Sequence, residues 1–209
     1  MNFAARRSKW KWFAVILLVL AVLGCRKPQE DKDLTPLDGL GGNFTLLAAD
    51  GKPFAFNSLR GKTVLLFFGY TACPDFCPAT MARLSRVYEN LRQKGLEDRV
   101  RTVFISVDPE RDTPEKLKQY LDYFSVKTIG VTGTNEELTS VAKQYGATFE
   151  KVQVNSAARY LMDHTTYVYL IDGLGRVRRL IHPEDPPEKI TGWVTRVAQE
   201  ACCKPKQGS

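Results

Sequence analysis

The sequence predicts an α/β fold in which helices flank a central mixed β-sheet, with an N-terminal β-ribbon added to it. Two observations carry this prediction. Apolar runs rich in β-branched and aromatic residues alternate along the chain with segments whose apolar residues recur at helical spacing, which is typical of parallel strands joined by crossover helices. The last elements are two apolar runs separated by a turn and followed by one amphipathic segment, and this order adds an antiparallel hairpin and a final helix.

The sheet begins with a short ribbon and a strongly apolar strand. Residues 44–47 and 53–56 flank the turn residues Asp50 and Gly51, a pattern that predicts an antiparallel pair. Residues 63–70 have the sequence TVLLFFGY. Because this run is apolar on both faces, it predicts a central strand that is covered by helices on both sides.

The remaining strands and helices follow in alternation. Asn135 is expected to cap its helix, and Gly146 follows the end of that helix, as helix-end preferences favour. The expected strands cover residues 100–107, 128–131, 165–171 and 176–181, and the expected helices cover residues 78–92, 114–124, 135–145 and 187–201. Strands and helices in this order describe a thioredoxin-like sandwich.

The acidic segment after the second central strand is expected to be structural. Asp112 or Thr113 is placed to cap the next helix, and Pro114 suits its first turn because proline has no N–H to leave unpaired there. We therefore expect helix capping and loop structure in this segment rather than contact with a partner.

Length and charge limit the classes of function. At 209 residues, the chain is long enough for one well-buried domain with short flanking segments. Its formal charge is +7, but residues 1–24 contain four cations and no acid, so the remainder carries 7 − 4 = +3. That remainder contains no dense basic stripe interleaved with aromatic residues. The sequence therefore does not indicate nucleic-acid binding.

The N-terminus has the pattern of a bacterial export signal. Its basic residues are followed by an apolar run over residues 12–24, which is shorter than the roughly 20 residues of a spanning helix. The run leads into the residues VLGC, which resemble a lipobox and end at Cys25. Residues 1–24 are therefore predicted to be a lipoprotein-type signal peptide, and Cys25 is predicted to be lipidated. An uncleaved membrane anchor is the alternative, and either one places the domain outside the cytoplasm.

The rest of the chain divides into a tether, a domain and a tail. Residues 25–43 combine Cys25 with a charged stretch that contains Pro and Gly, which predicts a flexible tether. The domain is expected to cover residues 44–201. A polar tail over residues 202–209 contains the adjacent Cys202 and Cys203, which we interpret as an auxiliary or incidental thiol pair.

A loop with two cysteines is the candidate site. Cys73 and Cys77 lie between the central strand and the first helix, and open α/β sheets place their ligands at the carboxyl ends of strands. Because Pro78 suits a first helical position, Cys77 is expected to cap the helix. A sulfur near the positive end of the helix dipole should have a lowered pKa, which favours the thiolate. A structural disulfide is the alternative, but so short a loop gains little stability from closure.

His164 is the candidate third ligand. It is expected to open the strand over residues 165–171, with Asp163 beside it to support the imidazole through a hydrogen bond, whereas His182 looks like an exposed residue at a strand end. Soft sulfur ligands select Cu(I), zinc or iron–sulfur iron, and two sulfurs with one imidazole suit trigonal Cu(I) with a position left open. The cysteine spacing by itself does not separate metal binding from thiol–disulfide exchange.

Several blocks of the chain, in order, resemble the Sco/SenC family. The cysteine loop with its flanks, FGYTACPDFCP, closely resembles the family signature, and ISVDPERDTP matches a second block. The blocks TGT, VAKQYG, DHT and YLID follow in the same order, so the resemblance covers residues 44–200. There are two departures: Ala72 stands where many relatives have histidine, and Thr165 stands where serine is common. Neither departure removes a ligand.

The resemblance implies a fold, a cofactor and a role. The fold is that of thioredoxin, and Cys73, Cys77 and His164 would bind copper as Cu(I) and Cu(II). The role would be that of a copper metallochaperone that assists assembly of the dinuclear copper (CuA) centre of cytochrome c oxidase. Its partner would be the copper-bearing subunit of the oxidase, and another periplasmic copper chaperone or a thiol reductase is a further candidate partner.

A thiol–disulfide reductase is the alternative function. It would use Cys73 and Cys77 as a catalytic pair to keep oxidase or other exported cysteines reduced. The protein would then be an enzyme, whereas a metallochaperone is a binding module. In both cases we expect the protein on the periplasmic side, anchored to a membrane as a lipoprotein through Cys25.

Overall fold

The structure is a computed structural model that describes residues 34–155 and 158–200. The predicted signal peptide, Cys25, and the tail with Cys202 and Cys203 lie outside the described residues. Among the described residues, no helix combines the length and the apolar character needed to span a bilayer.

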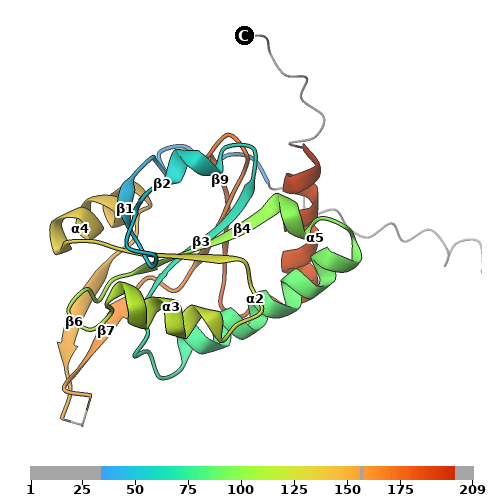
Figure 1. Ribbon diagram of the computed structural model, residues 1–209. Coiled ribbons are helices and arrows are strands. Elements are labelled where there is room, and N and C mark those ends of the chain that lie inside the picture. The colour runs from blue at the N-terminus through green and yellow to red at the C-terminus, as the bar shows by residue number, and fades with distance from the viewer. Residues whose placement is uncertain (1–33, 156–157, 201–209) are drawn as a thin grey trace, which may run out of the picture. The chain divides into compact units, whose positions relative to one another are not determined.

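The described residues form a seven-stranded mixed sheet (Figure 1). In sheet order its strands are β2 (Pro53–Ala55), β1 (Thr45–Ala48), β5 (Thr128–Thr132), β4 (Val100–Ser106), β3 (Thr63–Gly69), β8 (Val168–Ile171) and β9 (Val177–Ile181). The three central strands β5, β4 and β3 are parallel, and the outer strands pair antiparallel. A separate two-stranded sheet is formed by β6 (Phe149–Gln153) and β7 (Tyr160–His164).

Helices α2 (Phe76–Gln93) and α3 (Pro114–Asp122) lie on one face of the sheet. Phe67 of β3 and Phe104 of β4 form a T-shaped pair on this face, and Phe104 also contacts Tyr120 of α3. Helix α5 (Pro187–Glu200) packs beside α2, and Asn90 Nδ2 donates to Thr191 Oγ1 at 3.3 Å between them.

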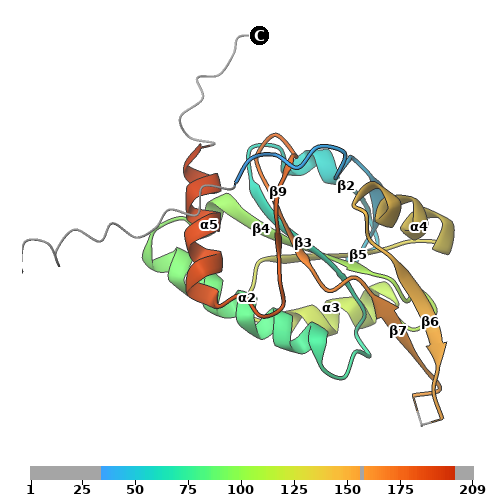
Figure 2. The ribbon, with the colours of Figure 1, turned by 180° about the vertical axis from the view of Figure 1, so that it is seen from behind.

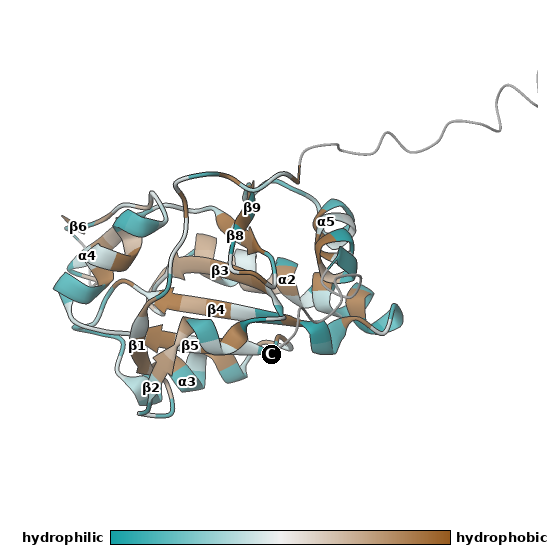
Figure 3. Ribbon diagram, turned by 90° about the horizontal axis from the view of Figure 1, so that it is seen from above, coloured by the Kyte–Doolittle hydropathy of each residue, from teal (hydrophilic) through white to brown (hydrophobic). Residues whose placement is uncertain are grey.

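Helix α4 (Asn135–Gln144) lies against the opposite face of the sheet. Phe68 of β3 points to that face and contacts Tyr145, which directly follows α4. Every residue of β3 is buried, and the central strands are the most hydrophobic ribbons of the molecule (Figure 3). The prediction of a thioredoxin-like α/β sandwich with a central mixed sheet flanked by helices is therefore confirmed. Two short 3-10 helices, η1 (Phe56–Leu59) and η2 (Glu97–Arg99), complete the described elements.

The β6–β7 hairpin is an element that the sequence analysis did not predict. Strand β6 has one partly buried residue followed by four exposed ones, and Met162 is the one buried residue of β7. Such strands lack the apolar run that identifies a buried strand. The hairpin projects beyond the main sheet in both ribbon views (Figures 1 and 2). The strand expected over residues 165–171 also begins later, at Val168.

The start of the domain also differs from the expectation. Residues 34–43, expected to belong to the tether, pack on the domain: Leu34 is 3% exposed, and Leu37 N–H donates to the Val177 carbonyl at 2.8 Å. Gly41 N–H donates to the Gln144 carbonyl at 2.8 Å. Apolar residues at 34, 37 and 40 supply enough surface to attach this segment to the core.

One helix cap was predicted correctly and another was wrong. Thr113 caps α3, as one of the two expected candidates, because its side chain accepts from Lys116 N–H. The cap of α4 is Thr134 rather than Asn135, and Glu137 completes a capping box. A Thr–x–x–Glu sequence allows both side chains to pair with backbone N–H groups, which outweighs the cap preference of asparagine.

Candidate metal centre

The cysteine loop lies where β3 ends and α2 begins. Cys73 is in the loop, and its sulfur accepts from the Cys77 N–H at 3.4 Å. Helix α2 starts at Phe76 with Asp75 as its cap, so the expectation that Cys77 caps the helix is wrong. Cys77 instead lies in the first turn of the helix and is 2% exposed. Both cysteines are free thiols in the structure.

His164 reaches the cysteines from the end of the β6–β7 hairpin. It is the last residue of β7 rather than the first of the next strand, and its Nε2 lies 3.9 Å from Cys77 Sγ. Its Nδ1 lies 3.0 Å from the Thr165 carbonyl. Because a carbonyl only accepts, Nδ1–H donates to it, and Nε2 is the ring nitrogen that faces the thiols. The support expected from Asp163 is absent: that side chain is exposed, and a backbone carbonyl orients the ring instead.

Three ligand atoms converge at this place. One ligand atom from each of Cys73, Cys77 and His164 lies within 4.8 Å of the other two. Among the described residues, this cluster of cysteine and histidine side chains is the one that could hold a metal ion. His182 is exposed and contacts the ring of Tyr167 at 4.8 Å between centroids. The structure therefore brings together the three residues singled out from the sequence and leaves His182 apart from them.

The two thiols differ in their ionisation. A hydrogen bond from the Cys77 thiol lowers the pKa of Cys73 to about 3 against the cost of burial, with further support from His164 and from the backbone N–H of Cys77 and Asp75. The same hydrogen bond, together with burial, raises the pKa of Cys77. The expected thiolate at Cys77 is therefore wrong, because the two sulfurs share one proton and the more accessible sulfur carries the charge.

A cavity of about 400 Å³ opens beside the thiols. Tyr70, at 2% exposed, forms part of its wall and meets the ring of His164 edge-on at 5.8 Å between centroids. Phe76 lies at its rim and is 52% exposed. Cys73 lines this cavity as well, so a ligand or a partner chain has access to one of the sulfurs.

Asp112 is a residue of the site that the sequence analysis misassigned. It does not cap α3; its Oδ2 accepts from the Thr71 N–H at 2.8 Å and its Oδ1 accepts from the Thr71 hydroxyl at 2.6 Å. Thr71 precedes Cys73 by two residues, so Asp112 holds the start of the cysteine loop. An acidic residue next to a helix start carries the same sequence signal in either role.

The SCO1/SenC family model matches residues 32–199 of the chain. A curated relative, the SCO2-like protein of Rickettsia felis, is 33% identical over 152 residues, which cover 72% of this chain and 73% of the relative.

Solved structures of related proteins have the same fold. Copper-bound ScoI of Bradyrhizobium japonicum is 38% identical with a TM-score of 0.68, over 76% of this chain and 99% of that chain. A SCO1/SenC family lipoprotein from Bacillus anthracis is 29% identical with a TM-score of 0.68, over 78% and 98% of the two chains. BsSco, described as a member of the Sco family of cytochrome c oxidase assembly proteins with a disulfide switch, is 26% identical with a TM-score of 0.64, over 79% and 96%.

Proposed function

Because the chain belongs to the SCO1/SenC family, we propose that it is a copper metallochaperone that assists assembly of the dinuclear copper (CuA) centre of cytochrome c oxidase. The observation that carries this proposal is the convergence of Cys73, Cys77 and His164 within 4.8 Å. Relatives that share the fold have been solved with copper bound, and one is described as belonging to a family of oxidase assembly proteins.

The donor set suits copper in both oxidation states. The two thiolates are soft ligands and the imidazole is a borderline one, and together these three ligands match the trigonal preference of Cu(I). Cu(II) is accommodated when a further ligand or water completes a tetragonal set. The Thr165 carbonyl accepts from His164 Nδ1, which fixes the ring orientation and leaves Nε2 as the nitrogen that would bind the metal.

Metal binding at this centre releases one proton from the thiol pair. Cys73 is already a thiolate, because its pKa is lowered to about 3 by the hydrogen bond from Cys77. Cys77 retains its proton until the metal replaces it, after which the proton leaves to solvent. Because copper competes with this proton for the Cys77 sulfur, copper affinity should rise as the pH increases.

The open side of the centre supports transfer of copper to an acceptor. A three-residue ligand set leaves a coordination position free, and the cavity of about 400 Å³ lies beside Cys73. Acceptor thiolates can enter there and replace ligands one at a time. We propose the copper-bearing subunit of the oxidase as the acceptor, with another periplasmic copper chaperone or a thiol reductase as a further partner.

A membrane anchor belongs to the same proposal. The residues VLGC that end at Cys25 have the pattern of a lipobox, and the Bacillus anthracis relative is described as a lipoprotein. We propose that Cys25 is lipidated and that the domain faces the periplasm. Diacylation supplies the two chains that stable anchoring requires and keeps the copper centre near a membrane-bound oxidase.

Copper titration of site variants tests the proposed centre. The purified full-length protein is titrated with Cu(I) and Cu(II) and compared with Cys73→Ser, Cys77→Ser and His164→Ala, with His182→Ala as the matched control. We expect one copper ion in the wild type and the control, thiolate-to-Cu(II) charge transfer in both, and loss of that absorption when either cysteine is replaced. Equal copper binding by all five proteins would overturn the proposal.

Thiol–disulfide exchange is a second candidate function, and the low pKa of Cys73 favours it. The Cys73 thiolate would attack a client disulfide and form a mixed disulfide, and Cys77 would then displace the client thiol. The client gains two thiols and the protein ends with a Cys73–Cys77 disulfide, so two electrons pass to the client. Because this step needs no imidazole ligand, His164→Ala should retain client reduction while it loses tight copper binding.

A further inference from the structure

The loop between β4 and α3, residues 107–113, contacts both chain segments that carry the proposed ligands. We infer that Arg111 in this loop is a positioning residue that holds the β6–β7 hairpin, and with it His164, at a set distance from the two thiols. This inference rests on the proposed copper site and adds to it a residue that does not touch the metal.

The hairpin needs such support because the main sheet does not supply it. Within the described residues, β6 and β7 pair with each other and form no ladder with the seven-stranded sheet. The Thr165 N–H donates to the Thr148 carbonyl at 3.0 Å, which continues the pairing inside the hairpin beyond Phe149 and His164 and adds no bond to the main sheet. Met162 is the one buried strand residue of the hairpin. An element with so few buried contacts opens easily unless side chains fasten it.

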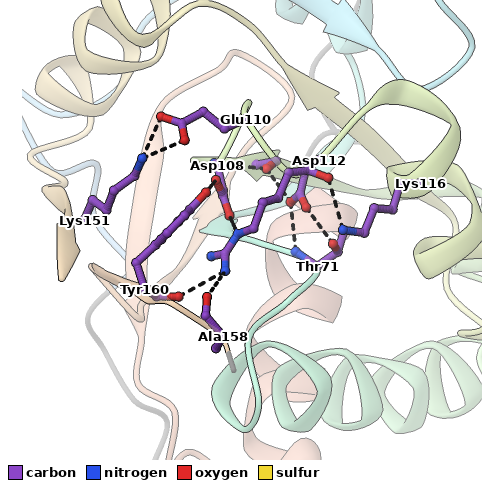
Figure 4. Close-up of polar contacts among 10 residues, drawn as sticks. Thr71, Asp108, Glu110, Asp112, Lys116, Lys151, Ala158 and Tyr160 are labelled. Carbon is purple, nitrogen blue, oxygen red and sulfur yellow. Dashed lines mark hydrogen bonds and ion pairs between the residues drawn. The ribbon is translucent and has the colours of Figure 1, made fainter. Parts of the chain in front are cut away.

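Arg111 fastens the far part of β7. Its Nη1 donates to the Tyr160 carbonyl at 3.0 Å, and its guanidinium carbon lies 3.7 Å from the centre of the Tyr160 ring. The Tyr160 hydroxyl in turn donates to Asp108 at 2.8 Å. Arg111 Nε forms an ion pair with the other oxygen of Asp108, which is 2% exposed. Figure 4 shows the labelled residues of this network converging from the loop and from the hairpin.

A second tie reaches the neighbouring strand. Lys151 of β6 donates to both carboxylate oxygens of Glu110, at 2.6 and 2.7 Å. The side chain of Glu110 is 58% exposed, and exposed ion pairs contribute at most about 1 kcal/mol. This ion pair is therefore weaker than the contacts of Arg111 with Tyr160. The loop therefore contacts both strands of the hairpin. Its contact with β7 involves the buried Asp108, whereas its contact with β6 is exposed.

The other end of the loop holds the cysteine segment. Asp112 accepts from the Thr71 N–H and hydroxyl and from the Ser106 hydroxyl at 2.6 Å. The turn from Asp108 to Asp112 is closed by a backbone hydrogen bond, because Asp112 N–H donates to the Asp108 carbonyl at 2.9 Å. One short loop thus contacts Thr71, which precedes Cys73 by two residues, and Tyr160 of the hairpin that ends at His164 (Figure 4).

Strand geometry carries the effect from Arg111 to His164. Tyr160, Met162 and His164 alternate with exposed or partly exposed neighbours, so all three project from the same face of β7. A strand rises about 3.3 Å per residue, so Tyr160 lies about 13 Å from His164 along it. Arg111 also lies 5.5 Å from the centre of the Tyr70 ring, which stands perpendicular to the His164 ring at 5.8 Å between centroids. Fixing Tyr160 therefore limits how far His164 can swing.

Loss of the contacts of Arg111 and Asp108 with Tyr160 should leave the two thiols in place and allow the His164 imidazole to move. Variants Arg111→Gln and Tyr160→Phe are compared with the wild type in the full-length protein, with Arg92→Gln as the matched control because Arg92 makes an exposed pair with Glu97. We expect Cu(II) affinity to fall about tenfold or more in both test variants, as loss of a ligand-orienting partner does. The Cu(II) spectrum should shift towards that of His164→Ala, and Arg92→Gln should match the wild type.

A double-mutant cycle decides whether Arg111 acts through His164. In the His164→Ala background, Arg111→Gln and Tyr160→Phe should cause no further loss of copper affinity, because the residue they position is gone. Additive losses would overturn the inference and indicate a general structural role. Wild-type copper affinity and spectrum in both single variants would overturn it as well.

The outcomes separate this inference from the proposed function. If His164→Ala itself leaves copper binding unchanged, the proposed site is wrong and the inference is overturned with it. If His164→Ala weakens binding while neither Arg111→Gln nor Tyr160→Phe does, the site stands and the positioning role is wrong. Tyr160→Phe removes a single hydroxyl and retains the ring beneath Arg111, so it preserves the fold if Arg111→Gln does not.

Discussion

At the scale of residues, Cys73 and Cys77 differ although they share one short loop. Cys77 is 2% exposed inside the first turn of α2, whereas Cys73 is 9% exposed and lines the cavity beside the site. The buried sulfur retains its proton and donates it, and the outer sulfur carries the charge. We therefore expect Cys73 to be the attacking nucleophile in thiol exchange and the first of the proposed ligands to bind the metal.

The ionisation of Cys73 is tested by its alkylation rate. Because its pKa is lowered to about 3, the thiolate predominates from about pH 4 upward, and the iodoacetamide rate should stay level between pH 5 and 8. An ordinary thiol with a pKa near 8.5 would react about tenfold faster for each pH unit over that range. Peptide mass spectrometry distinguishes Cys73 from Cys77, which should react slowly, and a tenfold rise per pH unit at Cys73 contradicts the assignment.

Gly69 leaves room for the sulfur of Cys77. A Cβ atom at this position would lie 2.8 Å from Cys77 Sγ and 3.0 Å from the Phe104 ring. We expect Gly69→Ala to destabilise the fold by about 1–3 kcal/mol, as overpacking does, and to weaken copper binding because the sulfur must move. Urea denaturation and copper titration measure the two effects.

Gly192 supplies the control for that substitution. It lies in α5, and a Cβ atom added there would meet nothing within 4 Å, so Gly192→Ala should stabilise the helix by about 0.5–1 kcal/mol and leave copper binding unchanged. Equal effects of the two substitutions would show that crowding at Cys77 is not the cause.

At the scale of elements, the β8–β9 turn depends on one buried carboxylate. Asp172, 6% exposed, accepts from the backbone N–H groups of Leu174 and Arg176, both at 3.0 Å, through Oδ1. Its Oδ2 accepts from the Arg176 and Arg178 side chains at 2.6 and 3.3 Å. Arg178 also pairs with Glu200 at the end of α5, so the carboxylate links the hairpin to the last helix.

Replacing Asp172 by Asn tests this link. Burial opposes the charge, but the hydrogen bonds from Arg176 outweigh burial and lower the pKa of Asp172 below its ordinary value. A folded-state pKa below the unfolded one contributes stability above the unfolded pKa, near 4, and loses it as pH falls through the folded pKa. Asp172→Asn should cost about 3 kcal/mol at pH 7.

The cost of Asp172→Asn should shrink as the pH is lowered below 4, because the unfolded wild type takes up a proton there while the folded carboxylate stays charged to lower pH. Denaturant unfolding at pH 7 and at pH 3 measures both values. Asp122→Asn is the control, because Asp122 is 63% exposed in its pair with Lys118 and such pairs contribute little. A cost independent of pH would contradict the role of the charge.

At the scale of the whole molecule, the copper centre joins distant parts of the chain. Cys77 and His164 are 87 positions apart and come from a helix and from a hairpin outside the main sheet. Copper that binds both should stabilise the folded state, because the unfolded chain does not hold the ligands together.

Thermal unfolding measures this coupling. Copper at 100 times its dissociation constant should add about 2.7 kcal/mol, which raises the Tm of a domain this size by about 5–10 °C. The shift should be lost in Cys73→Ser and reduced in His164→Ala. A shift of the same size in Cys73→Ser would place the copper elsewhere on the protein.

Much of the fold could be predicted from the sequence because its signals are local. The run over residues 63–70 is apolar on both faces, which only a covered central strand satisfies, and the alternation around it specifies parallel strands with crossover helices. The β6–β7 hairpin could not be predicted in this way, because exposed strands carry no apolar pattern and are held by side chains from elsewhere.

The sequence by itself determined that two cysteines lie at a strand–helix junction, and its ordered blocks singled out His164 as their partner. Only the tertiary structure decided which sulfur is ionised, since burial and hydrogen bonding depend on how α2 packs on β3. It also decided that Asp112 hydrogen-bonds to Thr71, 41 positions away in the sequence, and that Arg111 hydrogen-bonds to Tyr160, 49 positions away. Contacts between residues so far apart arise when the sheet forms, and no local pattern encodes them.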